Sequence, residues 1–155
     1  MTEPGISKDE ALKVTGEFFN AVPTQSFGRQ TMRSDVTWTA DFMEEGTVEG
    51  FEAVNEALKS QLAAFSDLSI SIAEDAIPAL FENGMVAVEL AISGTNDGDL
   101  PGIGMTGRSM EGRGMAFVTF DEAGQIAAVR TYWDWGALLA QLGMRSFARP
   151  GPVPG

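Results

Sequence analysis

The chain has 155 residues, of which 44% are hydrophobic and 21% are charged, a composition typical of one soluble globular domain. Its 22 acidic and 10 basic residues give a formal net charge of -12, which disfavours binding to nucleic acids and to anionic membranes. The sequence contains no Cys and no His, so any acid–base chemistry falls to carboxylates, Tyr or Lys.

The N-terminal half predicts two main helices separated by a short strand. Ser7 and Glu10 form a capping box, and apolar residues follow at helical spacing until Pro23. The predicted elements are a helix from residue 8 to 22, a short second helix within 25–34, a strand over 35–40, a loop over 41–46 and a helix over 51–65.

The C-terminal half predicts a meander of strands. Asn83-Gly84, between two apolar stretches, is a strong signal for a hairpin turn. The predicted elements are strands over 68–81, 85–93, 112–120 and 125–134, a glycine-rich long loop or hairpin with a flexible tip over 95–111, and a last helix that ends at Gly143. We expect this loop to be a mobile cover over a binding site.

This order of elements predicts an α+β fold, in which a strongly curved antiparallel sheet wraps around the N-terminal helices. Such a cone encloses an apolar cavity, where small ligands bind. We expect a flexible N-terminus at 1–6, one domain over 7–145 and a disordered Pro/Gly-rich tail over 146–155. No segment reads as a signal peptide or a membrane span, so a cytoplasmic location is expected.

Asp134 stands out because it follows a strand and is surrounded by aromatic residues. Alternation along the strand places Arg130, Tyr132 and Asp134 on one side. Apolar surroundings would raise the pKa of the Asp134 carboxyl toward values useful for proton transfer. The alternative is that Asp134 only caps the helix that follows it, since Asp is a favoured N-cap residue.

The run from Leu90 to Arg108, then Tyr-Trp-Asp134 and Leu-Leu-Ala-Gln-Leu-Gly143, resembles the SnoaL-like polyketide cyclases of the nuclear transport factor 2-like superfamily. The resemblance covers residues 11–143. It implies an α+β barrel, a cofactor-free and often dimeric enzyme, and an acid–base role for Asp134. Many relatives carry His where this chain has Asn96, and Asn cannot exchange a proton at neutral pH.

The candidate site residues come from the predicted strands and from that resemblance. The candidate catalytic residues are Asp134, Glu89 and Asp41, and the candidate substrate contacts are Trp38, Tyr132, Asn96, Arg130, Phe117 and Met115. Glu89 interrupts an apolar strand, so it either faces the cavity and pairs with Asp134 or is an ordinary solvated residue. Arg130 either pairs with a carboxylate or lies at the surface.

The leading hypothesis is a cofactor-independent cyclase that closes a ring in a hydrophobic, polyketide-like molecule by carboxylate acid–base chemistry. We expect no bound metal or cofactor, no nucleic acid or membrane partner, and a homodimer. One alternative is an epoxide-opening enzyme, a hydrolase or an ether cyclase, that uses a carboxylate pair. A second is a non-catalytic module for small-molecule binding or dimerisation.

Overall fold

The structure is a computed structural model that describes residues 6–25, 31–40, 46–100 and 102–144. Its elements are α1 (Lys8–Ala21), the 3-10 turn η1 (Val22–Thr24), β1 (Met32–Ala40), β2 (Thr47–Glu49), α2 (Phe51–Leu62), β3 (Ser69–Ile72), β4 (Ala79–Leu80), β5 (Met85–Thr95), β6 (Ser109–Phe120), β7 (Ile126–Trp133) and α3 (Trp135–Gln141). The expected N-terminal and C-terminal disorder falls almost wholly on residues 1–5 and 145–155, outside the described residues.

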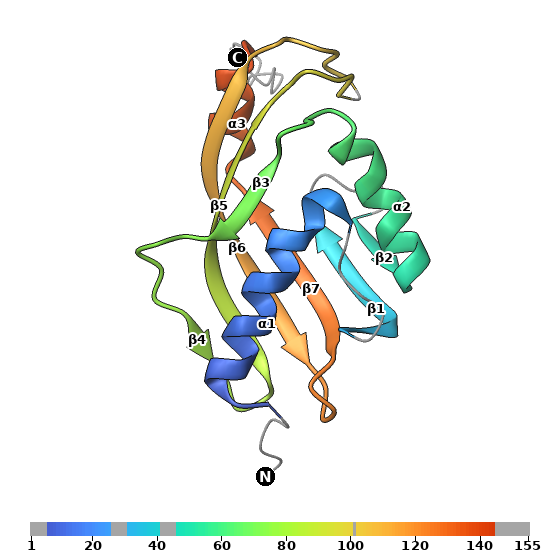
Figure 1. The fold of residues 1–155 in the computed structure, drawn as a ribbon, viewed down its shortest axis with the longest axis vertical. Coiled ribbons are helices and arrows are strands. Elements are labelled where there is room, and N and C mark those ends of the chain that lie inside the picture. Colours follow the sequence, from blue (N-terminus) through green and yellow to red (C-terminus); the bar gives the residue numbers. More distant parts are fainter. Residues whose placement is uncertain (1–5, 26–30, 41–45, 101, 145–155) are drawn as a thin grey trace, which may run out of the picture.

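The strands form one seven-stranded sheet in the order β2-β1-β7-β6-β5-β3, with β4 also paired to β5. Strands β5, β6 and β7 are consecutive and antiparallel, as the sequence predicts. Strand β1 pairs in parallel with β7, which makes the sheet mixed. The sheet is strongly curved, and β2 and β3 lie at opposite ends of its order, so it is an open α+β sheet and not a closed barrel (Figure 1).

Helix α1 crosses one face of the sheet and anchors the core there (Figure 1). Its start is the predicted cap, since the Glu10 amide donates to the Ser7 hydroxyl at 3.2 Å. Near its end, Phe18 and Phe19 pack against Trp38 of β1, with ring centroids 5.6 and 6.2 Å apart. We call the face that meets α1 and α2 the inner face and the opposite one the outer face.

Several elements differ from the sequence-based expectation, and among them α2 ends at Leu62 and not at residue 65, and the short strand β2 was not predicted. A short second helix was expected within 25–34, but β1 already begins at Met32, whose side chain is buried. The strand expected over 68–81 is interrupted after Ile72, and β4 is a separate two-residue strand. Of the two alternatives for 95–111, the structure shows the hairpin, because β5 and β6 stay paired as far as Thr95 and Ser109.

The strand predicted over 112–120 contains two glycines, and the structure keeps both within β6. Gly112 and Gly114 lie inside β6, in a register that pairs them with β5. A Cβ on Gly112 would lie 2.8 Å from Leu138, and one on Gly114 would lie 2.4 Å from Trp133. These glycines therefore allow close packing of α3 and β7 on the strand.

Candidate functional site

An apolar pocket lies between the inner face of the sheet and the end of α2. Its volume is about 60 Å³. All three tryptophans of the chain contribute to its walls. The lining residues are Phe19, Val22, Trp38, Leu58, Leu62, Phe65, Leu68, Ile70, Ile92, Met110, Trp133 and Trp135. Flat aromatic walls of this kind suit a planar hydrophobic ligand.

One polar pair lies next to this pocket. The indole N–H of Trp38 donates to the Thr131 hydroxyl at 3.0 Å, and both residues are buried. The bond is possible because β1 and β7 are neighbours and both side chains point to the inner face. A buried indole N–H without an acceptor would be costly, so Thr131 fixes the orientation of the Trp38 ring.

Asp134 lies at the edge of the pocket and outside its lining. Its side chain is exposed and accepts a hydrogen bond from the Ala137 amide at 3.1 Å, so it is the N-cap of α3. Its two neighbours in sequence, Trp133 and Trp135, both line the pocket. The expectation that the carboxylate lies inside the cavity is therefore not met, whereas the capping alternative describes the observed geometry.

Four predicted substrate contacts lie on the outer face of the sheet: Arg130, Tyr132, Phe117 and Met115. Tyr132 and Met115 are 42% and 37% exposed, and the Phe117 and Tyr132 rings pack edge to face with centroids 6.1 Å apart. The sequence correctly places Arg130 and Tyr132 on one side of β7. That side points away from the pocket, because Val129 and Thr131 are the buried residues of the strand.

Glu89 also lies on the outer face and belongs to a charged cluster. The Arg113 guanidinium lies 2.9 Å from the Glu89 carboxylate and 2.6 Å from that of Asp75. Hydrogen bonding to Arg113 lowers the pKa of Asp75, and the same bonds raise the pKa of Arg113. Glu89 and Asp134 thus have separate partners and do not form the carboxylate pair that was one of the two alternatives for Glu89. Asp41 lies outside the described residues.

Asn96 is buried within the β5–β6 hairpin and not in the pocket lining. Its amide donates to the carbonyls of Ala64 and Gly98 at 3.4 and 2.8 Å. Its oxygen accepts from the amide and the hydroxyl of Thr106 at 2.9 and 2.8 Å. All four hydrogen-bonding positions of the side chain are used, so Asn96 organises the hairpin and has none left for a substrate.

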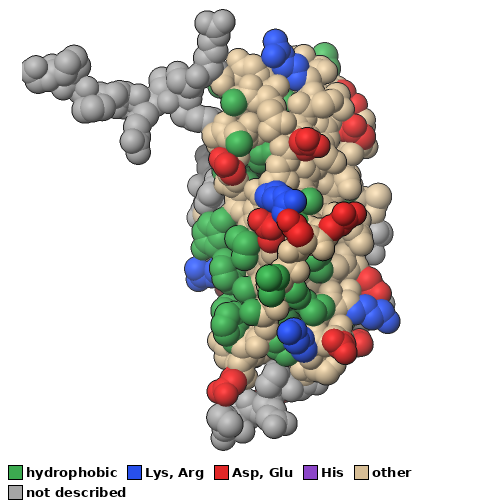
Figure 2. All heavy atoms as spheres, turned by 90° about the vertical axis from the view of Figure 1, so that its left-hand side faces the viewer, with side chains coloured by type: hydrophobic (Ala, Val, Ile, Leu, Met, Phe, Trp, Pro, Cys, Tyr) green, Lys and Arg blue, Asp and Glu red, His purple; other side chains and the backbone are tan. Residues whose placement is uncertain are grey.

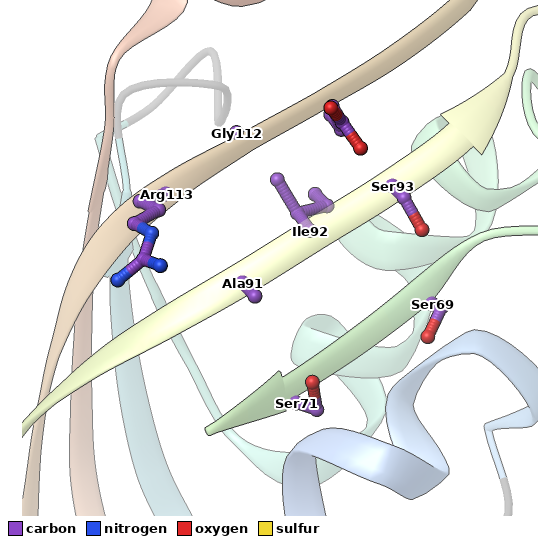
Figure 3. Close-up of a pocket in the computed structure, with 8 residues that line it drawn as sticks. Ser69, Ser71, Ala91, Ile92, Ser93, Gly112 and Arg113 are labelled. Atoms are coloured by element: carbon purple, nitrogen blue, oxygen red, sulfur yellow. The ribbon is translucent and has the colours of Figure 1, made fainter. Parts of the chain in front are cut away.

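A second hollow is a different feature, an open trough on the outer face of about 460 Å³. Small side chains of Ser69, Ser71, Ala91 and Ser93 form its floor, next to Arg113 (Figure 3). Farther along this side of the molecule, hydrophobic side chains gather beneath a cluster of acidic and basic ones (Figure 2). The trough is shallow and polar, so the enclosed aromatic pocket is the better candidate for a hydrophobic ligand.

Two further findings concern only the described residues. They contain no group of three or more acidic side chains that could hold a metal ion. None of their helices is both long and apolar enough to cross a membrane.

Sequence reasoning did not select the pocket-lining residues of β6, β7 and α3, namely Met110, Trp133 and Trp135, nor Thr131 beside them. The signal was present, because Val129, Thr131 and Trp133 alternate with the charged face of β7. The pattern separates the two faces of the strand but does not state which face receives the helices.

Comparisons with known proteins agree on the fold. A sequence model of the family described as SnoaL-like polyketide cyclase matches residues 17–142. Among curated proteins, no sequence matches this chain significantly. The similar solved structures include a candidate SnoaL-like polyketide cyclase from Jannaschia sp. CCS1, with 17% identity, a TM-score of 0.72, and coverage of 88% of this chain and 93% of the other.

Two Streptomyces structures are comparably similar. IdmH from Streptomyces antibioticus, described as a candidate polyketide cyclase, has 22% identity and a TM-score of 0.67. AclR from Streptomyces galilaeus, described as a candidate hydroxylase, has 19% identity and a TM-score of 0.69. In both comparisons 88% of this chain and 98% of the other are covered. At these identities the structures establish a shared fold, and their different descriptions show that the fold does not fix one reaction.

Proposed function

The chain belongs to the SnoaL-like polyketide cyclase family, and we propose that it is a cyclase that closes a ring in a hydrophobic, polyketide-like small molecule without a bound cofactor. The observation that carries this proposal is the pocket walled by all three tryptophans of the chain. Indole rings bury large apolar area and stack on flat conjugated ligands, which is how a partly cyclised polyketide would be recognised.

The pocket would contribute to ring closure mainly by holding the substrate in a reactive conformation. Packing a flexible molecule between Trp38 and Trp133 lowers the entropy cost of bringing two of its atoms together. The volume of about 60 Å³ is far below the roughly 300–1,000 Å³ typical of ligand sites, so binding requires a wall to move.

Asp134 is the carboxylate we assign to proton transfer, because both of its chain neighbours line the pocket. In the observed arrangement its carboxylate caps α3. Release of that cap and rotation about the side-chain bonds would turn the carboxylate toward a bound substrate. There it would accept the proton that the nucleophilic atom loses and return a proton to the closing ring.

A second candidate function, a non-catalytic carrier of a hydrophobic molecule, is favoured by one specific observation. In the described part of the chain, no carboxylate, Lys or Tyr lines the pocket. A carrier needs only apolar walls and a way in, whereas a cyclase also needs a group that moves protons.

The outer face supports a proposal of homodimerisation. Phe117 and Tyr132 form an aromatic pair there, beside the partly exposed Met115. Burying such residues against a second copy would remove apolar surface from water. Sedimentation velocity on the wild type and on Phe117→Asp tests this, since the variant should be a monomer if the face is the interface. A wild type that sediments as a monomer at high protein concentration would reject the dimer.

The function is tested by binding and turnover together. A planar probe such as 1,8-dihydroxyanthraquinone should quench the fluorescence of the three tryptophans, and a panel of partly cyclised polyketides should be converted. Asp134→Asn should bind the probe normally but lose about 10²–10⁴-fold in turnover. Full activity in Asp134→Asn would remove Asp134 from the mechanism. Probe binding with no conversion of any panel member would favour the carrier.

A further inference from the structure

The turn between α2 and β3 and the end of β5 exchange hydrogen bonds in a reciprocal way. Asp67, in the turn, accepts from the Thr95 amide at 2.6 Å and from the Thr95 hydroxyl at 2.9 Å. Asp97, just beyond β5, accepts from the Ser66 amide at 2.9 Å and also from the Ser66 hydroxyl. Each segment thus supplies one carboxylate and one hydroxyl residue to the other. We call these four residues the clasp.

The clasp is reinforced by backbone contact between the same two segments. The Gly98 amide donates to the Ala64 carbonyl at 3.1 Å. A Cβ on Gly98 would lie 2.0 Å from the Ala63 carbonyl oxygen, so only glycine permits this approach. Asn96, saturated by its own hydrogen bonds, holds the hairpin in the shape that presents Asp97.

The clasped turn is also a wall of the aromatic pocket. Phe65 and Leu68, which flank Ser66 and Asp67, both line it. Phe65 packs closely over β5, where a Cβ on Gly94 would lie 3.3 Å from its ring. Any movement of the clasp therefore moves Phe65 and Leu68 and changes the space inside the pocket.

The clasp differs from the other walls in the kind of interaction that holds it. The sheet, α1 and the Trp38–Thr131 pair are held by buried contacts, whereas the hydrogen bonds of the clasp are exposed to water. Water competes for exposed hydrogen bonds, so such segments open more readily than a packed core. Hydrogen bonds from Thr95 lower the pKa of Asp67, and those from Ser66 lower the pKa of Asp97, so both carboxylates are charged at neutral pH.

We propose that the clasp sets how readily the pocket opens, so that Asp67 and Asp97 are positioning residues that control the access of a hydrophobic ligand. The inference rests on the proposed function only in taking the aromatic pocket as the ligand site. It replaces the expected free lid with a hairpin tied to the turn between α2 and β3, whose opening is limited by two carboxylates.

Acrylamide quenching of tryptophan fluorescence tests the proposal on the ligand-free protein. Trp38 is buried in the pocket, so the wild type should have a protected fraction of its emission. Asp97→Ala and Asp67→Ala should each make that fraction roughly two- to tenfold more accessible to acrylamide. Asp97→Asn, which keeps one acceptor for the Ser66 amide, should be intermediate. Asp99→Ala is the matched control, because Asp99 is an exposed carboxylate of the same hairpin outside the clasp.

Stopped-flow measurement of probe binding tests whether opening of the pocket controls ligand access. With the anthraquinone probe, the clasp variants should associate faster and bind with a lower Kd, because a larger fraction of the protein already has an open pocket. Quenching and association rates equal to the wild type in both alanine variants would overturn the proposal, as would an equal effect of Asp99→Ala. If an alanine variant fails to fold, Ser66→Ala removes one hydroxyl donor and gives the same readouts. A pocket that opens to acrylamide but binds no probe would reject the proposed function and leave the clasp intact.

Discussion

The two faces of the sheet are built from the same strands but carry opposite chemistry. On the inner face, β6 and β7 present Met110, Thr131 and Trp133 to the helices and the pocket. On the outer face, the same strands present Arg113 and Tyr132 to solvent. The difference is set by a two-residue period, so it is visible in the sequence as alternation.

The comparison shows that the chemically reactive side chains are not the ones that build the pocket. The charged and hydroxyl-bearing side chains that attract attention in the sequence lie mostly on the outer face. In the sequence, the inner face is recognised by large apolar side chains and by the absence of charged ones.

The largest difference is expected for two phenylalanines. Phe18 is buried against Phe19 and Trp38, so Phe18→Ala should lower the free energy of unfolding by about 3–5 kcal/mol. Phe117 is only partly buried on the outer face, and Phe117→Ala should cost about 1 kcal/mol or less. Urea denaturation of both variants measures this, and equal losses would show that the outer face is also a packed core in solution.

A smaller effect is expected from one hydroxyl. Thr131→Val keeps the shape of the side chain but leaves the Trp38 indole N–H without its acceptor, which should cost about 1–3 kcal/mol. Thr131→Ser should retain the hydrogen bond and most of the stability. Thr119→Val, at an outer-face position of β6, is the control and should change the free energy of unfolding by less than about 0.5 kcal/mol. Equal effects at both positions would contradict the assigned faces.

The next largest effect on stability is expected at Asp134, at the edge of the pocket. Asp134→Ala removes the N-cap of α3 and should cost about 0.5–2 kcal/mol, whereas Asn caps nearly as well and should leave stability unchanged. Melting temperatures of the two variants separate capping from the effect on turnover. A stable, inactive Asp134→Asn fits the proposed cyclase, and loss of stability in both variants would mean that the charge itself is required for folding.

The smallest expected effect is on stability at low pH, and it arises at the clasp. Asp67 and Asp97 have lowered pKa values in the folded state because they accept hydrogen bonds from Thr95 and Ser66. Their contribution to stability is therefore complete above the unfolded pKa of about 3.9 and is lost as the pH falls through the lower folded values. The urea midpoint should fall less steeply below about pH 4 in an Asp67→Asn, Asp97→Asn double variant than in the wild type. Parallel pH profiles would show that other carboxylates dominate.

Much of the fold could be predicted because its signals are local. The cap at Ser7, the Asn83-Gly84 turn and the alternation of β5 to β7 each depend on a few neighbouring residues. The start of β6 at Ser109 is not predicted, because its pairing with Thr95 of β5 is a property of the assembled structure.

The candidate site was harder to predict than the fold. Trp38, a predicted substrate contact, lies in the pocket wall. Glu89 and Arg130 had two possible orientations, and alternation alone could not choose between them. Their burial depends on where α1 and α2 pack, which is a tertiary property. Asn96 resembles a polar contact in the sequence, but its partners come from three segments that only the folded chain brings together.

The central claim is that a hydrophobic ligand binds on the inner face, and two methionines of β6 test it most directly. Met110 lines the pocket, whereas Met115 points outward and is 37% exposed. Met110→Trp should fill the pocket and weaken binding of 1,8-dihydroxyanthraquinone by about tenfold or more, equivalent to about 1.4 kcal/mol, in isothermal titration calorimetry. Met115→Trp should leave Kd within about twofold of the wild type. Unchanged affinity in a folded Met110→Trp, with weaker binding in Met115→Trp, would place the ligand on the outer face and contradict the account.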